Sequence, residues 1–273
     1  ASQGLGEDWQ DKFTEASFTT IKLSGDEIYA FPSAMSAAGT VWYNNKLMTE
    51  NGVESFPATW EELQTAAQTL RGAGQIPLMF GGKDNWQNYD MFITIMATIN
   101  KDLCNGIFAL ENEWTESDVV KAFDYYQKLF TDGIVQDGAL STTLYNEGYS
   151  QWKDDDGNST IPMIFNGSWD MGSLKAENSF YENFSSNDIK VATMPSIEGK
   201  PGAVLTAPDV AWGVNANSAN KEAAWEFVKS LCYDMQQEVV DGLGFFSVLK
   251  DAPSPTVDLT DDYKAAYDVI SAA

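Results

Sequence analysis

Apolar positions along the chain fall into two kinds of segment. Short, nearly continuous apolar runs that end in polar turns are typical of strands covered on both faces. They occur within residues 25–32, 39–43, 76–80, 161–165, 189–194 and 210–214. Apolar residues at a spacing of three to four predict helices over 8–13, 44–50, 60–71, 88–100, 115–130, 142–152, 221–232, 234–241 and from 261 onward. Strands alternating with helices of this length predict an α/β protein with largely parallel sheets.

The helix at 60–71 carries the clearest local signals. Thr59-Trp-Glu-Glu62 is a capping box, in which the Thr and Glu side chains satisfy backbone N–H groups at the helix start. Leu63, Ala66, Ala67 and Leu70 then recur at helical spacing. Residues 4–24, by contrast, are polar, with only the short helix at 8–13 predicted there.

A strand followed by an aromatic residue lies in the stretch from Ile161 to Met171. The apolar run ends at Asn166-Gly167, and Ser168 is a good N-cap for a helix beginning at Trp169. Trp169 and Asp170 are therefore expected in a first helical turn, at the mouth of a strand-to-helix loop. Ligands of open α/β sheets bind at such loops.

Two interpretations of Trp169 are open at this point. Its indole can offer a flat apolar face to a ligand, while Asp170 accepts hydrogen bonds from hydroxyl groups and Gly167 lets the backbone approach closely. Alternatively, Trp169 packs beneath the loop as a local staple. The motif alone does not choose between them.

The charge balance narrows the classes of partner. The chain has 40 acidic and 16 basic residues, a net charge of −24, and no histidine. Such a charge repels nucleic acid and anionic lipid surfaces, so neither is expected as a partner. The absence of histidine removes Ser-His-Asp and Cys-His catalysis and most zinc sites, whereas carboxylate chemistry remains open.

Three further features of the sequence argue against a disulfide, a membrane-spanning helix and a metal site. Cys104 and Cys232 each lie in an apolar helical segment, which favours buried free thiols over a disulfide. The longest apolar stretch, Met91 to Ile99, is too short to span a bilayer and suits a buried helix. The loop Lys153-Asp-Asp-Asp-Gly157 lacks the glutamate of an EF-hand, so no metal or other cofactor is expected.

Aromatic residues follow strands or helix ends at three places: Trp86 with Tyr89, Trp169, and Phe245-Phe246. Carboxylates and amides accompany them, namely Asp84, Asn85, Asn88, Asp90 and Asp170. Pyranose rings have apolar C–H faces and a rim of hydroxyls, so flat rings beside planar polar groups favour a carbohydrate ligand.

Several motifs, in order, resemble those of the extracellular sugar-binding proteins of ABC importers, family 1, the maltose-binding-protein type. They are Gly25-Asp-Glu-Ile-Tyr-Ala-Phe-Pro32, Val41-Trp-Tyr-Asn-Asn-Lys-Leu47, Pro57-Ala-Thr-Trp-Glu-Glu-Leu63, Asn166-Gly-Ser-Trp169, Ala211-Trp-Gly-Val214 and Asn220-Lys-Glu-Ala-Ala-Trp-Glu-Phe227. The resemblance runs over nearly the whole chain.

This resemblance implies an α/β fold of the periplasmic-binding-protein-like, two-lobe type II architecture, in which hinge motion closes the lobes over a carbohydrate. Residues 1–37 and 208–246 are expected in the N-terminal lobe, and 38–207 and 247–273 in the C-terminal lobe. Family members begin with βαβ units that have no counterpart here, so the first lobe is expected to be incomplete.

Site residues follow from the same resemblance. Trp169 matches the family's stacking tryptophan, and Trp86 an aromatic contact of the second lobe, with Tyr89 near a similar contact. Residues 34–38 correspond to a hinge segment, where Ala37 replaces an acidic contact of the maltose-type member. Maltose is therefore not implied as the ligand. The expected ligand-binding set is Trp169, Trp86, Asp170, Tyr89, Asp84, Asp209, Phe246 and Met35.

The resemblance also implies partners and a location. The expected partners are a mono- or oligosaccharide and the transmembrane subunits of an ABC permease, with the protein itself a monomer. The expected location is extracellular, either periplasmic or at the cell surface through a lipid anchor.

Two other classes compete with this binding function. One is a glycoside hydrolase that uses two carboxylates, for instance Asp170 with Asp84 or Asp209. The other is a structural or adhesive surface protein, which would neither bind nor turn over a sugar.

Overall fold

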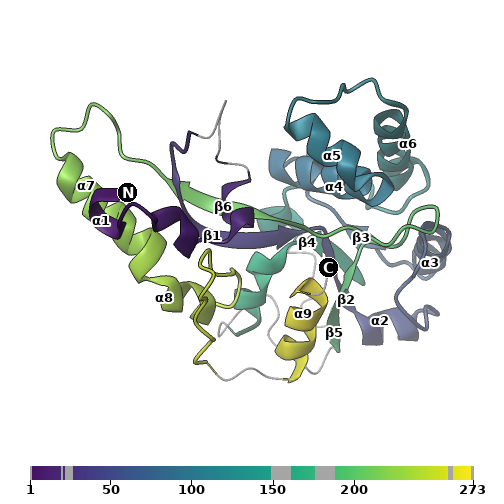
Figure 1. Cartoon of the computed structure of the whole chain (residues 1–273). Coiled ribbons are helices and arrows are strands. Elements are labelled where there is room, and N and C mark those ends of the chain that lie inside the picture. The colour runs from purple at the N-terminus through teal and green to yellow at the C-terminus, as the bar shows by residue number, and fades with distance from the viewer. Residues whose placement is uncertain are drawn as a thin grey trace. The chain divides into compact units, whose positions relative to one another are not determined.

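The computed structural model describes residues 2–19, 21, 27–148, 161–175, 188–257 and 261–271 (Figure 1). The chain divides into two compact units. Unit 1 comprises residues 1–37, 168–172 and 206–259, and unit 2 comprises 38–167, 173–205 and 260–273. Each unit is thus assembled from segments that are distant in the sequence, and each has its own hydrophobic core.

Unit 1 contains a two-stranded sheet and several short helices. Strands β1 (Phe31–Ala38) and β6 (Leu205–Trp212) lie side by side (Figure 1). The helices are α1 (Ser2–Leu5), the 3-10 helices η1 (Trp9–Lys12) and η2 (Glu15–Phe18), α7 (Lys221–Lys229), the π-helix η7 (Ser230–Asp234) and α8 (Gln236–Asp241).

The core of unit 1 is rich in aromatic residues. Several of them come from residues 4–24, which were expected to be polar apart from a short helix at 8–13. Trp9 stacks on Phe31 with 4.9 Å between the ring centroids, and Phe13 lies edge-on to Phe31 at 5.1 Å. Phe13 and Phe18 are both buried. These rings lie in and beside short 3-10 turns, so their spacing follows neither the α-helical nor the strand period.

A four-stranded sheet forms the centre of unit 2. Its order is β3 (Leu78–Met79), β4 (Met163–Asn166), β2 (Thr40–Asn44) and β5 (Ile189–Thr193). β3 pairs with β4 in parallel, but β2 is antiparallel to both of its neighbours. The expectation of a largely parallel sheet is therefore wrong for unit 2. Alternation of strands and helices does not determine which strands become neighbours.

Eight helices lie wholly within the described part of unit 2. They are α2 (Asn45–Glu50), α3 (Trp60–Gly72), α4 (Asn85–Ile99), α5 (Lys101–Phe108), α6 (Ser117–Thr131) and α9 (Asp261–Ser271), with the 3-10 helix η3 (Ala139–Ser141) and the π-helix η4 (Leu144–Gly148). Apolar residues of α2 to α6 and of η3 pack with residues of the sheet to form the core of this unit. No helix in the described ranges is long and apolar enough to cross a membrane.

The predicted helix start at Thr59 is confirmed. Thr59 Oγ1 accepts a hydrogen bond from the N–H of Glu62 at 3.2 Å. The Glu62 carboxylate in turn accepts from the N–H of Ala58 at 2.7 Å, one residue earlier than a standard capping box requires. Leu63, together with the other predicted apolar positions of this helix, is buried.

The structure differs from the predicted lobe boundaries at two places. Residues 168–172, expected in the C-terminal lobe, belong to unit 1. Residues 247–259 belong to unit 1 rather than being grouped with the second lobe. Val248 is buried in the unit 1 core, where its carbonyl accepts from the N–H of Thr14 at 2.9 Å. The N–H of Lys250 donates to the carbonyl of Lys12 at 3.0 Å. These contacts with the N-terminal stretch cannot be read from local sequence.

Some element boundaries also differ from the predictions. The strand expected within 25–32 is β1, which begins only at Phe31 and includes the segment expected as a hinge. The helix expected over 142–152 is described only as far as Gly148. Phe123 and Phe227 are exposed, although they lie at helical spacing with the apolar residues of the helices predicted over 115–130 and 221–232.

The capping interaction gives a first prediction. Thr59→Ala is expected to lower the free energy of unfolding by about 1 kcal/mol, because the N–H of Glu62 loses its side-chain acceptor. Urea denaturation followed by circular dichroism measures the change. Thr65→Ala is the matched control, since Thr65 is exposed within the same helix and alanine is the better helix former. Equal losses in both variants would contradict the capping role.

The two cysteines give a second prediction. Both are buried free thiols, as expected, and burial raises the pKa of Cys104 to about 11 and that of Cys232 to about 12. Because the thiolate is the reactive form, native protein at pH 8 is expected to react with Ellman's reagent far more slowly than protein in guanidinium. Unfolded protein should release two equivalents of thiol. Equally rapid labelling of native protein would contradict this expectation.

Candidate functional site

Five of the predicted site residues belong to unit 1 and three to unit 2. The unit 1 group is Met35, Trp169, Asp170, Asp209 and Phe246. The unit 2 group is Asp84, Trp86 and Tyr89.

In unit 1, β1 is joined to the segment that follows α8. Met35 and Phe246 form an antiparallel bridge, in which the N–H of Met35 donates to the carbonyl of Phe246 at 2.9 Å and the reverse bond is 2.8 Å. Met35 is buried in the core and Phe246 packs partly against it. Phe246 was expected as an exposed loop ring. It is half-buried because this bridge draws it onto the sheet.

Ser168 connects a third segment to these two. Its hydroxyl accepts a hydrogen bond from the N–H of Ala37 at 3.0 Å and donates to the carbonyl of Gly244 at 2.9 Å. Ser168 was expected as the N-cap of a helix starting at Trp169. It is instead the first residue of the 3-10 helix η5 (Ser168–Lys175), and its side chain bonds to other segments.

The backbones at Gly244 and Trp169 also pack closely, beside the hydroxyl group of Ser168. A Cβ atom at Gly244 would lie 2.8 Å from the carbonyl oxygen of Trp169, so a side chain there would force the two segments apart. Only glycine permits this approach. The position of Trp169 is thus determined by Ser168 on its own chain segment and by Gly244 on another.

Trp169 itself is half-buried, and Asp170 beside it is only 3% exposed. Asp170 was expected to present its carboxylate at an open loop mouth, and the structure places it inside the turn. Its role as a ligand contact stays a prediction, as does that of Trp169.

Asp209 lies on β6 and is exposed. One of its carboxylate oxygens accepts a hydrogen bond from the hydroxyl of Ser36 on β1 at 2.8 Å. Part of the hydrogen-bonding capacity of this carboxylate is therefore used within the protein, between the paired strands β1 and β6.

In unit 2, the loop between β3 and α4 is held by two side-chain amides, those of Gln87 and Asn88. The Gln87 side chain, which is fully buried, accepts from the N–H of Gly81 and donates to the carbonyl of Phe165, both at 2.9 Å. Asn88 donates to the carbonyl of Gly82 at 2.6 Å and accepts from the hydroxyl of Tyr126 at 2.7 Å. Asn88, expected among the polar groups around the ligand, is used in holding the loop.

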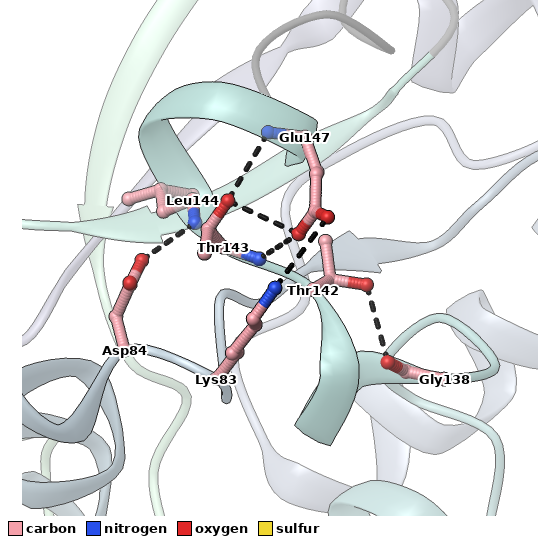
Figure 2. Close-up of polar contacts among 7 residues, drawn as sticks. All are labelled: Lys83, Asp84, Gly138, Thr142, Thr143, Leu144 and Glu147. Atoms are coloured by element: carbon pink, nitrogen blue, oxygen red, sulfur yellow. Dashed lines mark hydrogen bonds and ion pairs between the residues drawn. The ribbon is translucent and has the colours of Figure 1, made fainter.

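Asp84 joins this loop to the segment around η4, as Figure 2 shows. Its carboxylate accepts from the N–H of Leu144 at 2.7 Å and makes no side-chain cap to α4, although it stands at the N-cap position. A Cβ atom at Gly81 would lie 2.5 Å from the same Leu144 nitrogen, which shows how closely the segments pass. Asp84 thus positions the turn at η4 by a charge-assisted hydrogen bond.

A second carboxylate, that of Glu147, closes the same turn (Figure 2). It accepts from the N–H of Thr143 at 2.6 Å and from the Thr143 hydroxyl at 3.1 Å, and pairs with Lys83 at 3.7 Å. These hydrogen bonds, that from the Thr143 N–H first, lower the pKa of Glu147 below its usual value. The Lys83 ammonium reaches it from the β3–α4 loop, so both carboxylates connect the same two segments.

This arrangement brings Tyr145 onto Trp86. The two rings stack with 5.8 Å between centroids and 21° between planes, and Tyr145 is exposed. Tyr145 was missed from the sequence, because it lies far along the chain from Trp86 in a turn that was expected to be helical. Only its being an aromatic between polar neighbours could have drawn attention to it.

Tyr89 is exposed one helical turn after Trp86, with its ring edge-on to Phe108 at 6.0 Å. Partial burial raises the pKa of its hydroxyl above the usual value, and the negative charge of Asp90 raises it further. The hydroxyl is therefore protonated near neutral pH and can donate a hydrogen bond.

No group of three or more His, Cys, Asp and Glu residues that could hold a metal occurs in the described ranges. The acidic loop at 153–157 lies outside those ranges. Of the carboxylates considered for hydrolysis, Asp84 is occupied by a backbone N–H and Asp170 is buried.

The chain is similar in sequence to known bacterial binding proteins. A binding protein of Brucella abortus (strain 2308) is 25% identical over 269 residues, covering 90% of this chain and 57% of the relative. The chain thus spans little more than half the length of that relative.

Solved structures show the fold. A chitin oligosaccharide binding protein has a TM-score of 0.77 at 22% identity, covering 100% of this chain and 65% of that one. A protein solved in work on xylan utilization by Caldanaerobius polysaccharolyticus has a TM-score of 0.81 at 19% identity, covering 99% and 67%. The expected α/β fold of the two-lobe binding proteins is confirmed, and it is incomplete relative to those chains.

The sequence matches the family of bacterial extracellular solute-binding proteins over residues 3–237, which is most of the chain. The match includes both groups of site residues except Phe246. On this ground the chain belongs to the bacterial extracellular solute-binding protein family.

Proposed function

We propose that the protein binds a saccharide and delivers it to the transmembrane subunits of an ABC importer, without chemical change to the ligand. The observation that carries the proposal is the stacked pair Trp86–Tyr145, whose two segments are joined by hydrogen bonds to the carboxylates of Asp84 and Glu147. A braced pair of aromatic rings is suited to the apolar face of a pyranose.

The unit 1 residues contribute a second aromatic contact in this proposal. Trp169 is half-buried, so part of its surface is accessible, and the Ser168 and Gly244 contacts hold its backbone. A segment whose backbone is already held loses little conformational entropy when a ligand binds. The two aromatic groups are proposed separately, each as a saccharide contact of its own unit.

The partners and location in this proposal also rest on the family. Its members are extracellular solute-binding proteins, and the solved relatives include a chitin oligosaccharide binding protein. We therefore place this protein outside the cytoplasm, as a monomer in the periplasm or as a lipid-anchored monomer at the cell surface. A ligand that binds the closed state more tightly shifts the protein towards closure by that difference in affinity.

The role of Trp169 gives a direct test. Trp169→Ala is expected to weaken saccharide binding by about 1–3 kcal/mol, which is about 5- to 150-fold in Kd, because the ligand loses an aromatic face. Isothermal titration calorimetry against chitin and xylan oligosaccharides measures the change. Phe227→Ala, which removes an exposed ring on α7, is the matched control and should bind normally.

Three outcomes would count against the proposal. Unchanged affinity in Trp169→Ala removes Trp169 from the site. Absence of binding by any saccharide overturns the function. New reducing ends after incubation of the wild-type protein with the same oligosaccharides would assign it to the glycoside hydrolases instead.

The bracing of Tyr145 gives a second test. Glu147→Gln is expected to weaken saccharide binding about fivefold, because the neutral amide is a poorer acceptor for the Thr143 N–H and the turn that carries Tyr145 loosens. Thr142→Val is the control, since the Thr142 hydroxyl bonds only to the carbonyl of Gly138 among the contacts in Figure 2.

The same carboxylate predicts a dependence on pH. The pKa of Glu147 is lowered in the folded protein, so its contribution is complete above the usual value of 4.5 and is lost as the pH falls through the lowered value. Wild-type affinity should therefore fall in that acidic range more than the affinity of Glu147→Gln. Parallel pH profiles for the two proteins would contradict the bracing role.

A further inference from the structure

A row of aromatic rings continues from Trp86 along α4. Trp86, Tyr89 and Phe92 recur every third residue, and side chains at this spacing lie next to one another on one face of a helix. Each of the three meets a ring from another segment. We call the whole set the ring row: Trp86, Tyr89, Phe92, Phe108, Trp114, Phe123 and Tyr145.

The ring contacts form three groups, one at each of the three aromatic residues of α4. After Tyr145 on Trp86 and Phe108 on Tyr89, Phe92 lies 4.3 Å from Phe123 and 6.4 Å from Trp114, measured between centroids. The planes of Phe92 and Trp114 differ by 27°, so these two rings are stacked. The members come from α4, α5, α6, η4 and the loop before α6, all within unit 2.

The row is unusually exposed for so many aromatic rings. Tyr89, Phe108, Trp114, Phe123 and Tyr145 each keep between 46% and 52% of their surface accessible. They include every exposed aromatic ring in the described part of unit 2. Contiguous apolar surface of this kind is typical of a binding site rather than of a solvated face.

Polar groups suited to hydroxyls flank the far end of the row. A shallow hollow between the starts of α5 and α6 is lined mainly by amides, carboxylates and a serine. Two of its lining residues, Asn112 and Glu116, flank Trp114 in the sequence. Aromatic faces next to a polar hollow match the two kinds of surface on a sugar chain.

Charge argues against other occupants of the row. The chain has a net charge of −24, so nucleic acid, anionic lipid and a second copy of the chain are all repelled. Carboxylates also lie at the hollow, where Asp102, Glu116 and Asp118 are present. A neutral polyhydroxylated ligand meets no such repulsion, and its hydroxyls can donate to these carboxylates.

We propose that the ring row is a track for a neutral, linear oligosaccharide, whose chain runs from the Trp86–Tyr145 pair along α4 to Phe123 and Trp114. This inference rests on the proposed function and specifies its ligand as an oligosaccharide of several residues rather than a monosaccharide. Trp114 and Phe123 act at the distal end and contact only longer chains.

Chain length is the variable that tests this track. Calorimetry with chitin oligosaccharides and with xylo-oligosaccharides, each from one to six residues, should show affinity that rises with length. Each ring contact adds about fivefold, since it contributes about 1 kcal/mol. The double variant Trp114→Ala/Phe123→Ala should lose about tenfold or more for the longest chain that binds and nothing for the shortest.

Two controls separate ring contact from indirect effects. Trp114→Phe/Phe123→Tyr keeps an aromatic face at both positions and should retain most of the dependence on length. Leu140→Ala removes an exposed apolar side chain of unit 2 outside the row and should bind like the wild type. Circular dichroism and size-exclusion chromatography establish that each variant is folded and show its oligomeric state.

The outcomes distinguish the inference from the function on which it rests. If no saccharide of any length binds, both fail. If saccharides bind with an affinity independent of length, or if the double variant weakens short and long chains equally, the track is overturned while the binding function stands. A double variant that changes the oligomeric state and leaves saccharide binding intact assigns the row to protein association and overturns the track.

Discussion

The arrangement of the unit 1 site depends on one buried hydroxyl group. A hydroxyl removed from water costs free energy unless its hydrogen bonds are replaced, and Ser168 replaces both of them with backbone groups. The two partners, Ala37 and Gly244, lie on segments far from Ser168 in the sequence. Trp169 follows directly, so the place of its backbone is determined by groups that need not touch a ligand.

Unit 2 follows the same principle with different residues. Gln87, Asn88, Asp84 and Glu147 all bond to backbone or side-chain groups of neighbouring segments, and the loop and turn they join are thereby held together. Aromatic rings need no such partners, so they can be displayed on the surface that results. Polar residues beside a predicted binding ring can therefore serve to hold the segment that carries the ring, and their position alone does not make them ligand contacts.

Local signals in the sequence predicted local structure well. The cap at Thr59 and the apolar spacing after it identified α3, and the strands β2, β4 and β5 followed from short apolar runs. Strand direction was not predictable in this way, because the neighbours of β2 come from much later in the chain.

The candidate site shows the same division between local and distant information. Residue type alone suggested that Asp84 and Asn88 face a ligand, but the groups that occupy them belong to residues far along the chain. The pairing of Tyr145 with Trp86 was hidden for the same reason. A motif shows which chemical groups are present, and only the fold shows which of them remain accessible.

The two cysteines have a consequence for how the chain responds to oxidation. Each thiol is enclosed in the core of a different unit, and neither forms a covalent crosslink. Each unit is stabilised instead by the packing and the hydrogen bonds within its own core. The native packing of each unit therefore includes a reduced thiol, and oxidation of that thiol would require its core to open first.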